Sequence, residues 1–382
     1  MKVYDVIIIG GGSVGVPTAF YLSQKGLKVA VIDELASTGR GQNRAAIGGL
    51  RATHSDPSKI KLCQLSLDIV RNFYDTYGMD IDWIQGGYLY PVYDEGTEST
   101  LKKLLVKQKE FNLNIDWISP GRISELCPGI NTEGLRGGTF SPEDGSASPL
   151  KTTGAYHKLC LDNKVDFYFN SKVTSLDVKG DKITTVHTND EVFSAGMIIN
   201  AAGAYAHDIG EMAGIDIPVK PDSHEGAVTE AVQRFFEPMV VDIRPNDFSL
   251  NYYFYQNKEG QVVFCLTPSP SIWGTDTDNT SSFLPQVVQR MVQLYPRLRN
   301  LRIRRTWRGL YPYTPDGFPI IGFTKEISNL FLAVGMCGQG FMLGPGVGKM
   351  TSEILVDKSD AYNFILDQLS LYRQFAGAEV LK

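Results

Sequence analysis

The chain alternates between short apolar runs and glycine-rich turns, and the pattern is clearest at the start. Residues Val6–Ile9 form an apolar run that passes directly into the glycine turn Gly10–Gly15. A helix is predicted from about Pro17 to Gln24, and a second apolar run, Lys28–Ile32, ends at Asp33. Short apolar runs bounded by glycines favour buried strands. The segment therefore predicts a strand, a turn, a helix and a second strand that ends in an acid.

The same periodicities predict the elements up to about residue 215. A helix is expected from Asp56-Pro57 to about Tyr77, because apolar residues recur every three or four positions. Further helices are expected over Lys102–Phe111 and near 150–162. Strands are predicted at Gly86–Tyr93, Val165–Phe169, Lys172–Val178 and Val192–Asn200. The last strand leads into Asn200-Ala-Ala-Gly203, a second glycine turn with a helix behind it.

Beyond Pro218 the pattern changes from helices to strands. A mostly antiparallel sheet is predicted from segments rich in β-branched and aromatic residues, namely 226–232, 250–256 and 261–267. A helix is expected over 283–295. Three prolines predict a loop after it, at Pro312, Pro315 and Pro319.

A third glycine turn follows near residue 335. The predicted strand Leu330–Val334 runs into Gly335–Gly340, and the next helix is expected to start near Gly346. These elements predict an α/β protein whose Rossmann-like nucleotide-binding domain is discontinuous. A second, α+β domain with a mixed or antiparallel sheet completes the chain, since 382 residues exceed what one core usually holds. The nucleotide-binding domain is assigned to residues 1–85, 145–215 and 320–382, and the substrate-binding domain to residues 86–144 and 216–319.

Composition describes an ordinary globular protein and excludes several classes. Hydrophobic residues make up 43% and charged residues 21%, with a net charge of −5 and no run of Lys or Arg. Nucleic acid is therefore not expected as a partner. No apolar stretch is long enough to span a membrane, and because the chain opens on a predicted strand we expect no signal peptide. The five cysteines form no CxxC pair, so we expect buried thiols, no metal site and a cytoplasmic location.

The first glycine turn has the spacing of a dinucleotide-binding motif. Gly10 permits the tight turn, Gly12 lets a pyrophosphate approach the backbone, and Gly15 lets the helix pack on the strand. The start of the helix presents unpaired N–H groups to the phosphates. Asp33 can accept a hydrogen bond from an adenosine ribose hydroxyl, and its charge disfavours NADP. The motif alone does not separate FAD from NAD.

The order of the glycine turns along the chain resembles a flavoprotein family. An NAD-binding domain usually completes its sheet in one continuous stretch, whereas here the last unit lies far from the first. The chain resembles the family of D-amino-acid oxidase, glycine oxidase and monomeric sarcosine oxidase. The residues that carry the resemblance are Gly10–Asp33, Gly39–Arg51, Asn200–Gly203, Thr314–Asp316, Ile320–Gly322 and Gly335–Gly346. Within the family, Trp307–Asp316 and Gly338–Met342 are most similar to the β-subunits of sarcosine oxidase and L-proline dehydrogenase.

The resemblance implies FAD as the cofactor and places its contacts. The loop Arg40–Arg44 would lie along the pyrophosphate and flavin, and the backbone near Val173 would meet the adenine. The turn 338–342 would direct N–H groups at the flavin N1–C2=O edge, where reduced flavin carries negative charge. The FAD-contacting residues implied by the motif and the resemblance are Gly10, Gly12, Ser13, Val14, Gly15, Asp33, Glu34, Arg40, Gly41, Gln42, Asn43, Arg44, Val173, Ala202, Gly203, Met336, Gly338, Gln339, Gly340, Phe341 and Met342.

Three positions depart from better-known members of the family. Monomeric sarcosine oxidase tethers its flavin through a cysteine where this chain has Gly309, so we expect FAD to be bound non-covalently. Glycine oxidase and D-amino-acid oxidase anchor the substrate carboxylate with an arginine where this chain has Tyr311. Sarcosine oxidase uses a lysine where this chain has Met342. Two usual carboxylate anchors are therefore missing.

Arg51 remains as the expected anchor of a substrate carboxylate. It matches an arginine that faces the flavin in sarcosine oxidases, and a guanidinium can hold a carboxylate through two hydrogen bonds. Tyr252 and Tyr311 are expected to orient the substrate as pocket walls and hydroxyl donors. His54 and His224 are candidates for the border of the pocket.

The activity implied by the resemblance is the FAD-dependent oxidation of a C–N bond. A hydride would pass from the carbon next to a neutral amine to flavin N5, with sarcosine, proline, hydroxyproline or an opine as the substrate class. The similarity to the β-subunits favours a dehydrogenase over an oxidase. It also implies an oligomer in which a partner subunit takes the electrons. Three alternatives stay open: a 2-hydroxy-acid or glycerol-phosphate enzyme, a flavin-bearing subunit that only relays electrons, and an NAD-linked dehydrogenase.

Overall fold

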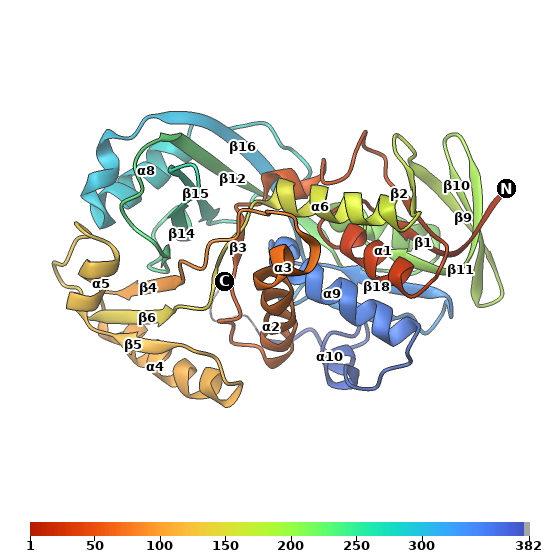
Figure 1. Ribbon diagram of the computed structural model, residues 1–382, viewed down its shortest axis with the longest axis horizontal. Helices are drawn as coiled ribbons and strands as arrows, with labels where there is room; N and C mark the ends of the chain where they lie inside the picture. The colour runs from red at the N-terminus through yellow and green to blue at the C-terminus, as the bar shows by residue number, and fades with distance from the viewer. Residues whose placement is uncertain (378–382) are drawn as a thin grey trace.

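The computed structural model describes residues 1–377, which form two large β-sheets lying side by side (Figure 1). The first sheet is on the right of Figure 1 and the second on the left. Residues 378–382 of the predicted segment 320–382 lie outside the described residues. Both sheets draw their strands from segments far apart in the sequence, as the predicted α/β fold with a discontinuous nucleotide-binding unit requires.

The first sheet has the strand order β17 (Ile320–Phe323), β18 (Leu330–Val334), β11 (Val192–Asn200), β1 (Lys2–Ile9), β2 (Val29–Ile32) and β8 (Asp166–Tyr168), extended from β11 by β10 (Lys182–Thr188) and β9 (Val173–Lys179). Strand β1 pairs in parallel with both β2 and β11. Its side chains alternate: Val6 and Ile8 enter one core, and Ile7 and Ile9 enter the core on the opposite face. A strand covered on both faces reads as a continuous apolar run, which explains why the sequence identified it.

Helices cover one face of this sheet. They are α1 (Gly15–Gln24), α2 (Pro57–Arg71), α3 (Phe73–Tyr77), α6 (Pro149–Asp162), α9 (Gly340–Leu355) and α10 (Asn363–Gln368). Figure 1 shows α1, α6 and α9 in front of the sheet, and Phe20, Tyr156 and Val347 from these helices share one buried core. The opposite face is covered by β9, β10, the 3-10 turn η2 (Gly203–Tyr205) and α7 (Ala206–Met212).

The second sheet has the strand order β16 (Ile303–Tyr313), β12 (Lys220–Ala231), β15 (Gln261–Pro268), β14 (Ser249–Gln256), β13 (Met239–Asp242), β4 (Tyr88–Val92), β6 (Gly137–Ser141) and β5 (Asp116–Ile118). Its described strand pairs are antiparallel except for the parallel pair of β13 and β4, so the sheet is mixed. The accompanying helices are α4 (Glu95–Glu110), α5 (Pro120–Leu126), α8 (Phe283–Leu294) and the 3-10 turn η3 (Pro296–Asn300).

Two short strands and a 3-10 turn lie at the junction of the sheets. Strand β3 (Gly49–Leu50) pairs with β7 (Gly145–Ser146), and η1 (Gln42–Ala45) precedes β3. These segments carry several of the predicted site residues.

The structure differs from the sequence-based expectations at several elements. The last long helix, α9, begins at Gly340 rather than near Gly346, because Pro345 removes only one backbone donor and the helix continues through it. Pro312 lies in strand β16 rather than in a loop, and its carbonyl accepts a hydrogen bond from Cys337 N at 3.1 Å. Strand β10 was not predicted, because polar residues occupy most of its positions.

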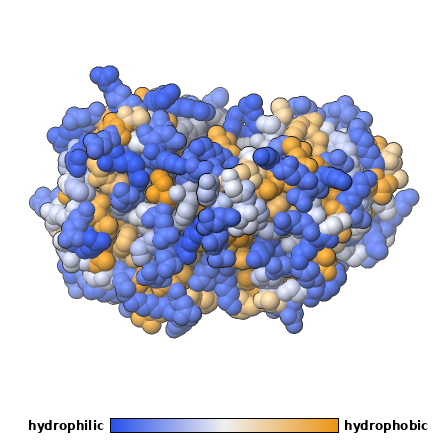
Figure 2. All heavy atoms as spheres, viewed as in Figure 1, coloured by the Kyte–Doolittle hydropathy of each residue, from blue (hydrophilic) through white to orange (hydrophobic). Residues whose placement is uncertain are grey.

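The surface in Figure 2 shows apolar side chains in small groups among hydrophilic ones. Within residues 1–377, no helix has both the length and the apolar character needed to cross a membrane. The cysteines described are all free and buried, as their spacing predicted.

Candidate active site

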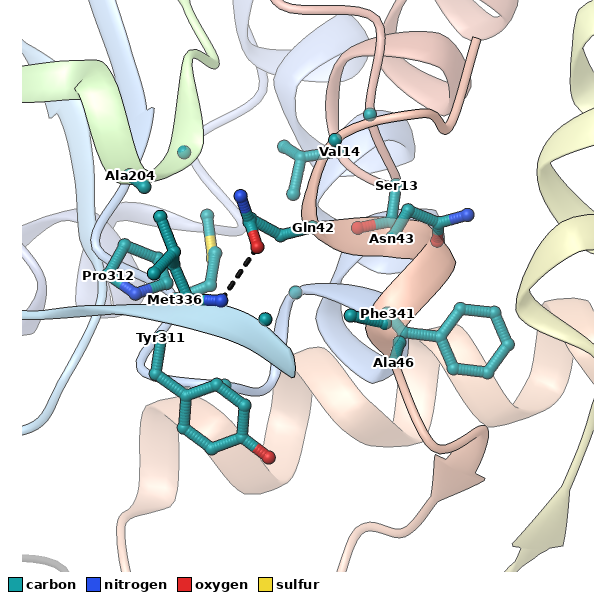
Figure 3. Close-up of a pocket in the computed structure, with 18 of the residues that line it drawn as sticks. Ser13, Val14, Gln42, Asn43, Ala46, Ala204, Tyr311, Pro312, Met336 and Phe341 are labelled. Atoms are coloured by element: carbon teal, nitrogen blue, oxygen red, sulfur yellow. Dashed lines mark hydrogen bonds between the residues drawn. The ribbon is translucent and has the colours of Figure 1, made fainter. Parts of the chain in front are cut away.

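A cavity of about 580 Å³ is lined by residues of both sheets. The first sheet contributes the ends of β1, β2 and β18 and the turn after β11, and the second contributes residues of β4, β12, β14 and β16. The carboxyl ends of parallel strands meet at one edge of a sheet, so the three glycine turns that follow them converge there. Close to this edge, Figure 3 shows residues of the first turn, the η1 loop, β16 and the C-terminal turn around one space.

Two glycines of the first turn have different roles, one toward the cavity and one toward the packing of a helix. A Cβ on Gly12 would meet no protein atom within 4 Å, so that position is open on the cavity side. A Cβ on Gly15, the first residue of α1, would lie 1.9 Å from the carbonyl oxygen of Gly10. Gly15 therefore serves helix packing and does not line the cavity. No side chain caps the start of α1, so its N–H groups remain available to an anion.

Asp33 directly follows β2 and lines the cavity. Its Oδ2 accepts a hydrogen bond from Gly11 N at 2.7 Å, and its Oδ1 accepts one from Leu35 N at 2.8 Å. Burial raises the pKa of Asp33, although both backbone donors act against this. Each carboxylate oxygen has a second lone pair, so the group can still accept from a ribose hydroxyl.

The η1 loop crosses from the first sheet to the second. Gln42 Oε1 accepts a hydrogen bond from Leu310 N of β16 at 2.6 Å, the dashed line in Figure 3. Asn43 Nδ2 donates to Pro149 O at 3.1 Å, but its buried Oδ1 has no hydrogen-bond partner among the described residues. Gln339 Oε1, from the C-terminal turn, is also buried and has no hydrogen-bond partner within residues 1–377. Both amides line the cavity, and buried acceptors without a donor point to a missing hydrogen-bonding ligand.

The two arginines predicted in this loop do not line the cavity. Arg40 and Arg44 are exposed, and Arg44 borders a second cavity of about 350 Å³ instead. The sequence pattern identified the loop but not which of its side chains turn inward. The predicted contacts that do line the cavity are Gly10, Gly12, Ser13, Val14, Asp33, Glu34, Gly41, Gln42, Asn43, Val173, Ala202, Gly203, Met336, Gly338, Gln339, Gly340, Phe341 and Met342.

The C-terminal turn brings a second helix start to the cavity. Helix α9 begins at Gly340 without a side-chain cap. A Cβ on Gly344 would lie 1.9 Å from the carbonyl oxygen of Ser13, so α9 crosses the first glycine turn at close range. The uncapped starts of α1 and α9 therefore both belong to the wall of one cavity, which favours negative charge in it.

Aromatic side chains and one arginine line the part of the cavity formed by the second sheet. The hydroxyl oxygens of Tyr253 and Tyr311 lie 3.2 Å apart, and Tyr88 lines the wall nearby. Arg51 is 5% exposed, and its Nη1 donates a hydrogen bond to Thr53 O. Arg51 and Tyr311 thus both lie on the wall of the cavity. The arrangement offers a cation, hydroxyl groups and a water-poor wall to a small anionic molecule.

His224 also lines the cavity and stacks on the ring of Tyr311. The ring centroids are 3.8 Å apart with an interplanar angle of 13°. His224 Nε2 lies 3.1 Å from Asp222 Oδ2, and a carboxylate only accepts, so Nε2 carries the proton. Burial lowers the pKa of His224, and Asp222 reverses only part of that effect. The imidazole is therefore neutral at neutral pH.

Tyr252 does not lie in the cavity, which corrects the sequence-based expectation. It is fully buried on the other face of β14, where its hydroxyl donates to Asp242 Oδ2 at 2.8 Å. Successive strand residues face opposite sides, so the neighbouring Tyr253 lines the cavity instead. His54 is buried outside the cavity, with its Nε2 3.4 Å from Cys63 Sγ. Tyr253 could have been found only by knowing which face of β14 meets the cavity.

The amino-acid sequence of the chain matches the model of a known protein family. The model described as DAO, FAD dependent oxidoreductase, matches residues 5–354. The chain belongs to this family of FAD-dependent oxidoreductases. The family implies FAD, which agrees with the three glycine turns, the open face of Gly12 and the unpartnered amide oxygens of Asn43 and Gln339.

Individual relatives of this FAD-dependent oxidoreductase cover most of the chain. The β subunit of sarcosine oxidase from Arthrobacter sp is 27% identical over 380 residues, covering 95% of this chain and 89% of the relative. The mitochondrial sarcosine dehydrogenase of Mus musculus is 25% identical over 377 residues. The match covers 94% of this chain but only 41% of that protein. Among solved structures, L-proline dehydrogenase from P. horikoshii superimposes with a TM-score of 0.91 at 28% identity, covering 97% of this chain and 98% of that one.

FAD fits the residues of the cavity. Residues of the two uncapped helix starts would hold the pyrophosphate and the flavin edge, and Asp33 would hold the ribose. The amide oxygens of Asn43 and Gln339 would accept from N–H and hydroxyl groups of the cofactor.

Proposed function

We propose that the chain oxidises the C–N bond of an amino acid or secondary amine, with sarcosine, proline, hydroxyproline or an opine as the substrate class. The observation that supports this is Arg51, a buried cation on the wall of the same cavity as the paired hydroxyl groups of Tyr253 and Tyr311. The names of the relatives, which include sarcosine oxidase and L-proline dehydrogenase, point to the same class.

In this proposal the protein binds, orients and desolvates the substrate. Arg51 holds the carboxylate through two hydrogen bonds, and the hydroxyl groups of Tyr253 and Tyr311 fix the amine end. When bound, FAD supplies the two-electron acceptor that takes the hydride from the carbon next to nitrogen. The nitrogen lone pair forms the C=N bond of the imine, a proton leaves from nitrogen, and water later hydrolyses the imine.

The positions of the cationic side chains on the cavity wall favour an amino acid over a glycerol phosphate as the substrate. Among the described residues of the cavity wall, the arginine and lysine side chains are those of Arg51 and Lys172. Lys172 adjoins Val173, on the part of the wall formed by the first sheet. Arg51 follows β3 at the junction of the sheets, and a single cation there suits a singly charged carboxylate better than a phosphate dianion. Electron relay without catalysis, the other alternative, is a possible outcome of the test below.

Non-covalent binding of FAD is a further part of the proposal. Gly309 provides no nucleophile at the position where monomeric sarcosine oxidase is tethered. Among the described wall residues the cysteines are Cys265 and Cys337, and burial raises the pKa of both thiols. A protonated thiol is a poor nucleophile, so a covalent link is disfavoured.

A partner subunit that accepts the electrons is proposed on the same basis. The relative from Arthrobacter sp is named as a β subunit, and the chain spans less than half of the mouse relative. Additional protein therefore accompanies this fold in those relatives. We also propose the domain limits predicted from the sequence. Within the described residues these are 1–85, 145–215 and 320–377 around the first sheet, and 86–144 and 216–319 around the second.

The test is anaerobic reduction of the bound FAD by a panel of compounds. Sarcosine, L-proline, hydroxyproline and an opine are compared with lactate and glycerol 3-phosphate, and loss of the oxidised-flavin absorbance is recorded. We expect reduction by one of the amino acids, with an apparent Kd raised about tenfold or more by Arg51→Ala. Arg44→Ala is the matched control, since Arg44 is exposed and outside this cavity. Reduction by a hydroxy compound alone, or by none, would refute the proposal.

A further inference from the structure

One buried carboxylate, Asp144, fastens the segment that follows Arg51. Asp144 lies between β6 and β7, far from Arg51 in the sequence. Its Oδ1 accepts a hydrogen bond from Ala52 N at 3.0 Å, and its Oδ2 accepts one from Thr53 Oγ1 at 3.1 Å. The two residues directly after Arg51 are therefore bound to the two oxygens of a single side chain.

Thr53 in turn contacts the guanidinium. Arg51 Nη1 donates a hydrogen bond to Thr53 O, so the carboxylate fixes the residue that holds the arginine head group. Asp144 is itself held by the backbone: Gly87 N donates to Asp144 O at 2.9 Å, and the pairing of β3 with β7 aligns the two segments. A continuous path of hydrogen bonds thus leads from the second sheet to the cation on the cavity wall.

The burial of Asp144 opposes its ionisation. The residue is 2% exposed, and burial raises the pKa of its carboxyl to about 6, although donors from Ala52, Ser141 and Thr53 and the charge of Arg51 act in the other direction. A buried charge of this kind lowers stability relative to a neutral isostere. Asparagine would retain the acceptor for Ala52 N without this cost. A carboxylate that opposes stability beside a cavity is more typical of functional sites than of structural ones.

We propose that Asp144 is a positioning residue that sets the Arg51 guanidinium on the cavity wall so that it binds the carboxylate of the substrate. This inference rests on the proposed function, in which Arg51 is the carboxylate anchor. Asp144 does not line the cavity, and its hydrogen bonds to Ala52 and Thr53 fix the segment that follows Arg51.

The test measures binding of a carboxylate probe to the FAD-loaded chain. Pyrrole-2-carboxylate is titrated into wild-type, Arg51→Ala, Asp144→Ala and Asp144→Asn proteins, and perturbation of the flavin spectrum gives Kd. The uncharged pyrrole-2-carboxamide is the control ligand. We expect Asp144→Ala to raise the Kd of the carboxylate about tenfold and to leave that of the amide unchanged. Asp144→Asn should recover most of the affinity, because its amide can accept from Ala52 N and donate to Thr53 Oγ1.

A pH profile separates positioning from a purely structural role. The groups that face Asp144 are Arg51 and Tyr88, and both keep their charge state between pH 5 and pH 8. As the pH falls through about 6, Asp144 becomes neutral and keeps the hydrogen bonds that asparagine would make, so the wild-type Kd for the carboxylate should rise only as far as that of the Asp144→Asn protein. The Asp144→Asn protein should lack this rise. At pH 8 the melting temperature of the Asp144→Asn protein should be no lower than that of wild type, since the variant buries no charge at this position.

Each outcome decides between the two proposals. If Arg51→Ala leaves Kd unchanged, or wild type shows no preference for the carboxylate, the proposed function fails, and the positioning role fails with it. If Arg51→Ala weakens binding while Asp144→Ala does not, only the positioning role is overturned. Should Asp144→Ala fail to fold, Thr53→Val removes the Oγ1 hydrogen bond at constant shape. It should raise the Kd of the carboxylate about threefold, and an unchanged Kd would overturn the proposal.

Discussion

Tyr252 and Tyr253 are adjacent in the sequence, yet their hydroxyl groups serve different parts of the molecule. Tyr252 OH donates to Asp242 Oδ2 at 2.8 Å and to Arg290 O at 3.1 Å in the core beneath α8. Tyr253 lies on the cavity wall beside Tyr311. The alternation of a strand separates the two side chains by half a turn, so one substitution tests packing and the other tests the site.

Phenylalanine substitutions should separate these roles. Tyr252→Phe removes a buried hydroxyl and leaves Asp242 short of a donor, so we expect it to lower the free energy of unfolding by about 1–3 kcal/mol. The rate of flavin reduction should be unchanged. Tyr253→Phe should slow reduction or raise the substrate Kd severalfold with little loss of stability. Urea denaturation and anaerobic stopped-flow absorbance measure the two effects, and the reverse pattern would return Tyr252 to the site.

Helices α1 and α9 meet at the first glycine turn, where two glycines face different neighbours. A Cβ on Gly12 would enter open space in the cavity, whereas a Cβ on Gly344 would lie 1.9 Å from the carbonyl oxygen of Ser13. The first glycine therefore leaves room for a ligand, and the second lets one element pack on another.

Alanine at each position should have opposite consequences. Gly12→Ala should leave the melting temperature of the FAD-free protein unchanged and weaken FAD binding about tenfold or more, because the methyl group would occupy the pyrophosphate approach. Gly344→Ala should lower the stability of the FAD-free protein by about 1–3 kcal/mol, because α9 must shift away from Ser13. Calorimetry of the FAD-free protein and fluorescence titration with FAD make the comparison. Normal FAD affinity in Gly12→Ala would contradict the assigned pyrophosphate position.

At the scale of the whole molecule, the cavity wall is shared between the two sheets. Gln42 connects the η1 loop to β16 through Leu310 N, and the glycine turns of three chain segments close the other side. A cofactor that contacts all of these segments would bind only the folded chain. Its binding free energy would then add to the stability of the entire fold.

Removal of FAD should therefore destabilise the protein reversibly. Unfolding in guanidinium followed by filtration should release all of the flavin, because Gly309 offers no tether. The melting temperature of the FAD-free protein should rise with added FAD, by an amount equivalent to about 2.7 kcal/mol when free FAD is one hundred times its Kd. Flavin retained by the unfolded chain would show a covalent bond and refute this prediction.

The sequence by itself determined the class of cofactor and predicted most of the residues that line the cavity. The unit from Gly10 to Asp33 is local: its turn, helix and second strand follow one another directly along the chain, so their spacing alone predicts a nucleotide site. The turns at Asn200–Gly203 and Gly335–Gly340 follow the same local rules, and their order along the chain indicated the flavoprotein family.

Only the tertiary structure decided which side chains complete the substrate end. Tyr253 rather than Tyr252 reaches the cavity because the face of β14 that meets it depends on how the second sheet packs. Arg40 and Arg44 point away from the cavity for a similar reason, since a loop has no periodicity from which its inward side can be predicted. The contact of Asp144 with Ala52 and Thr53 joins segments remote in sequence. Such contacts arise from the packing of whole elements, which no local pattern encodes.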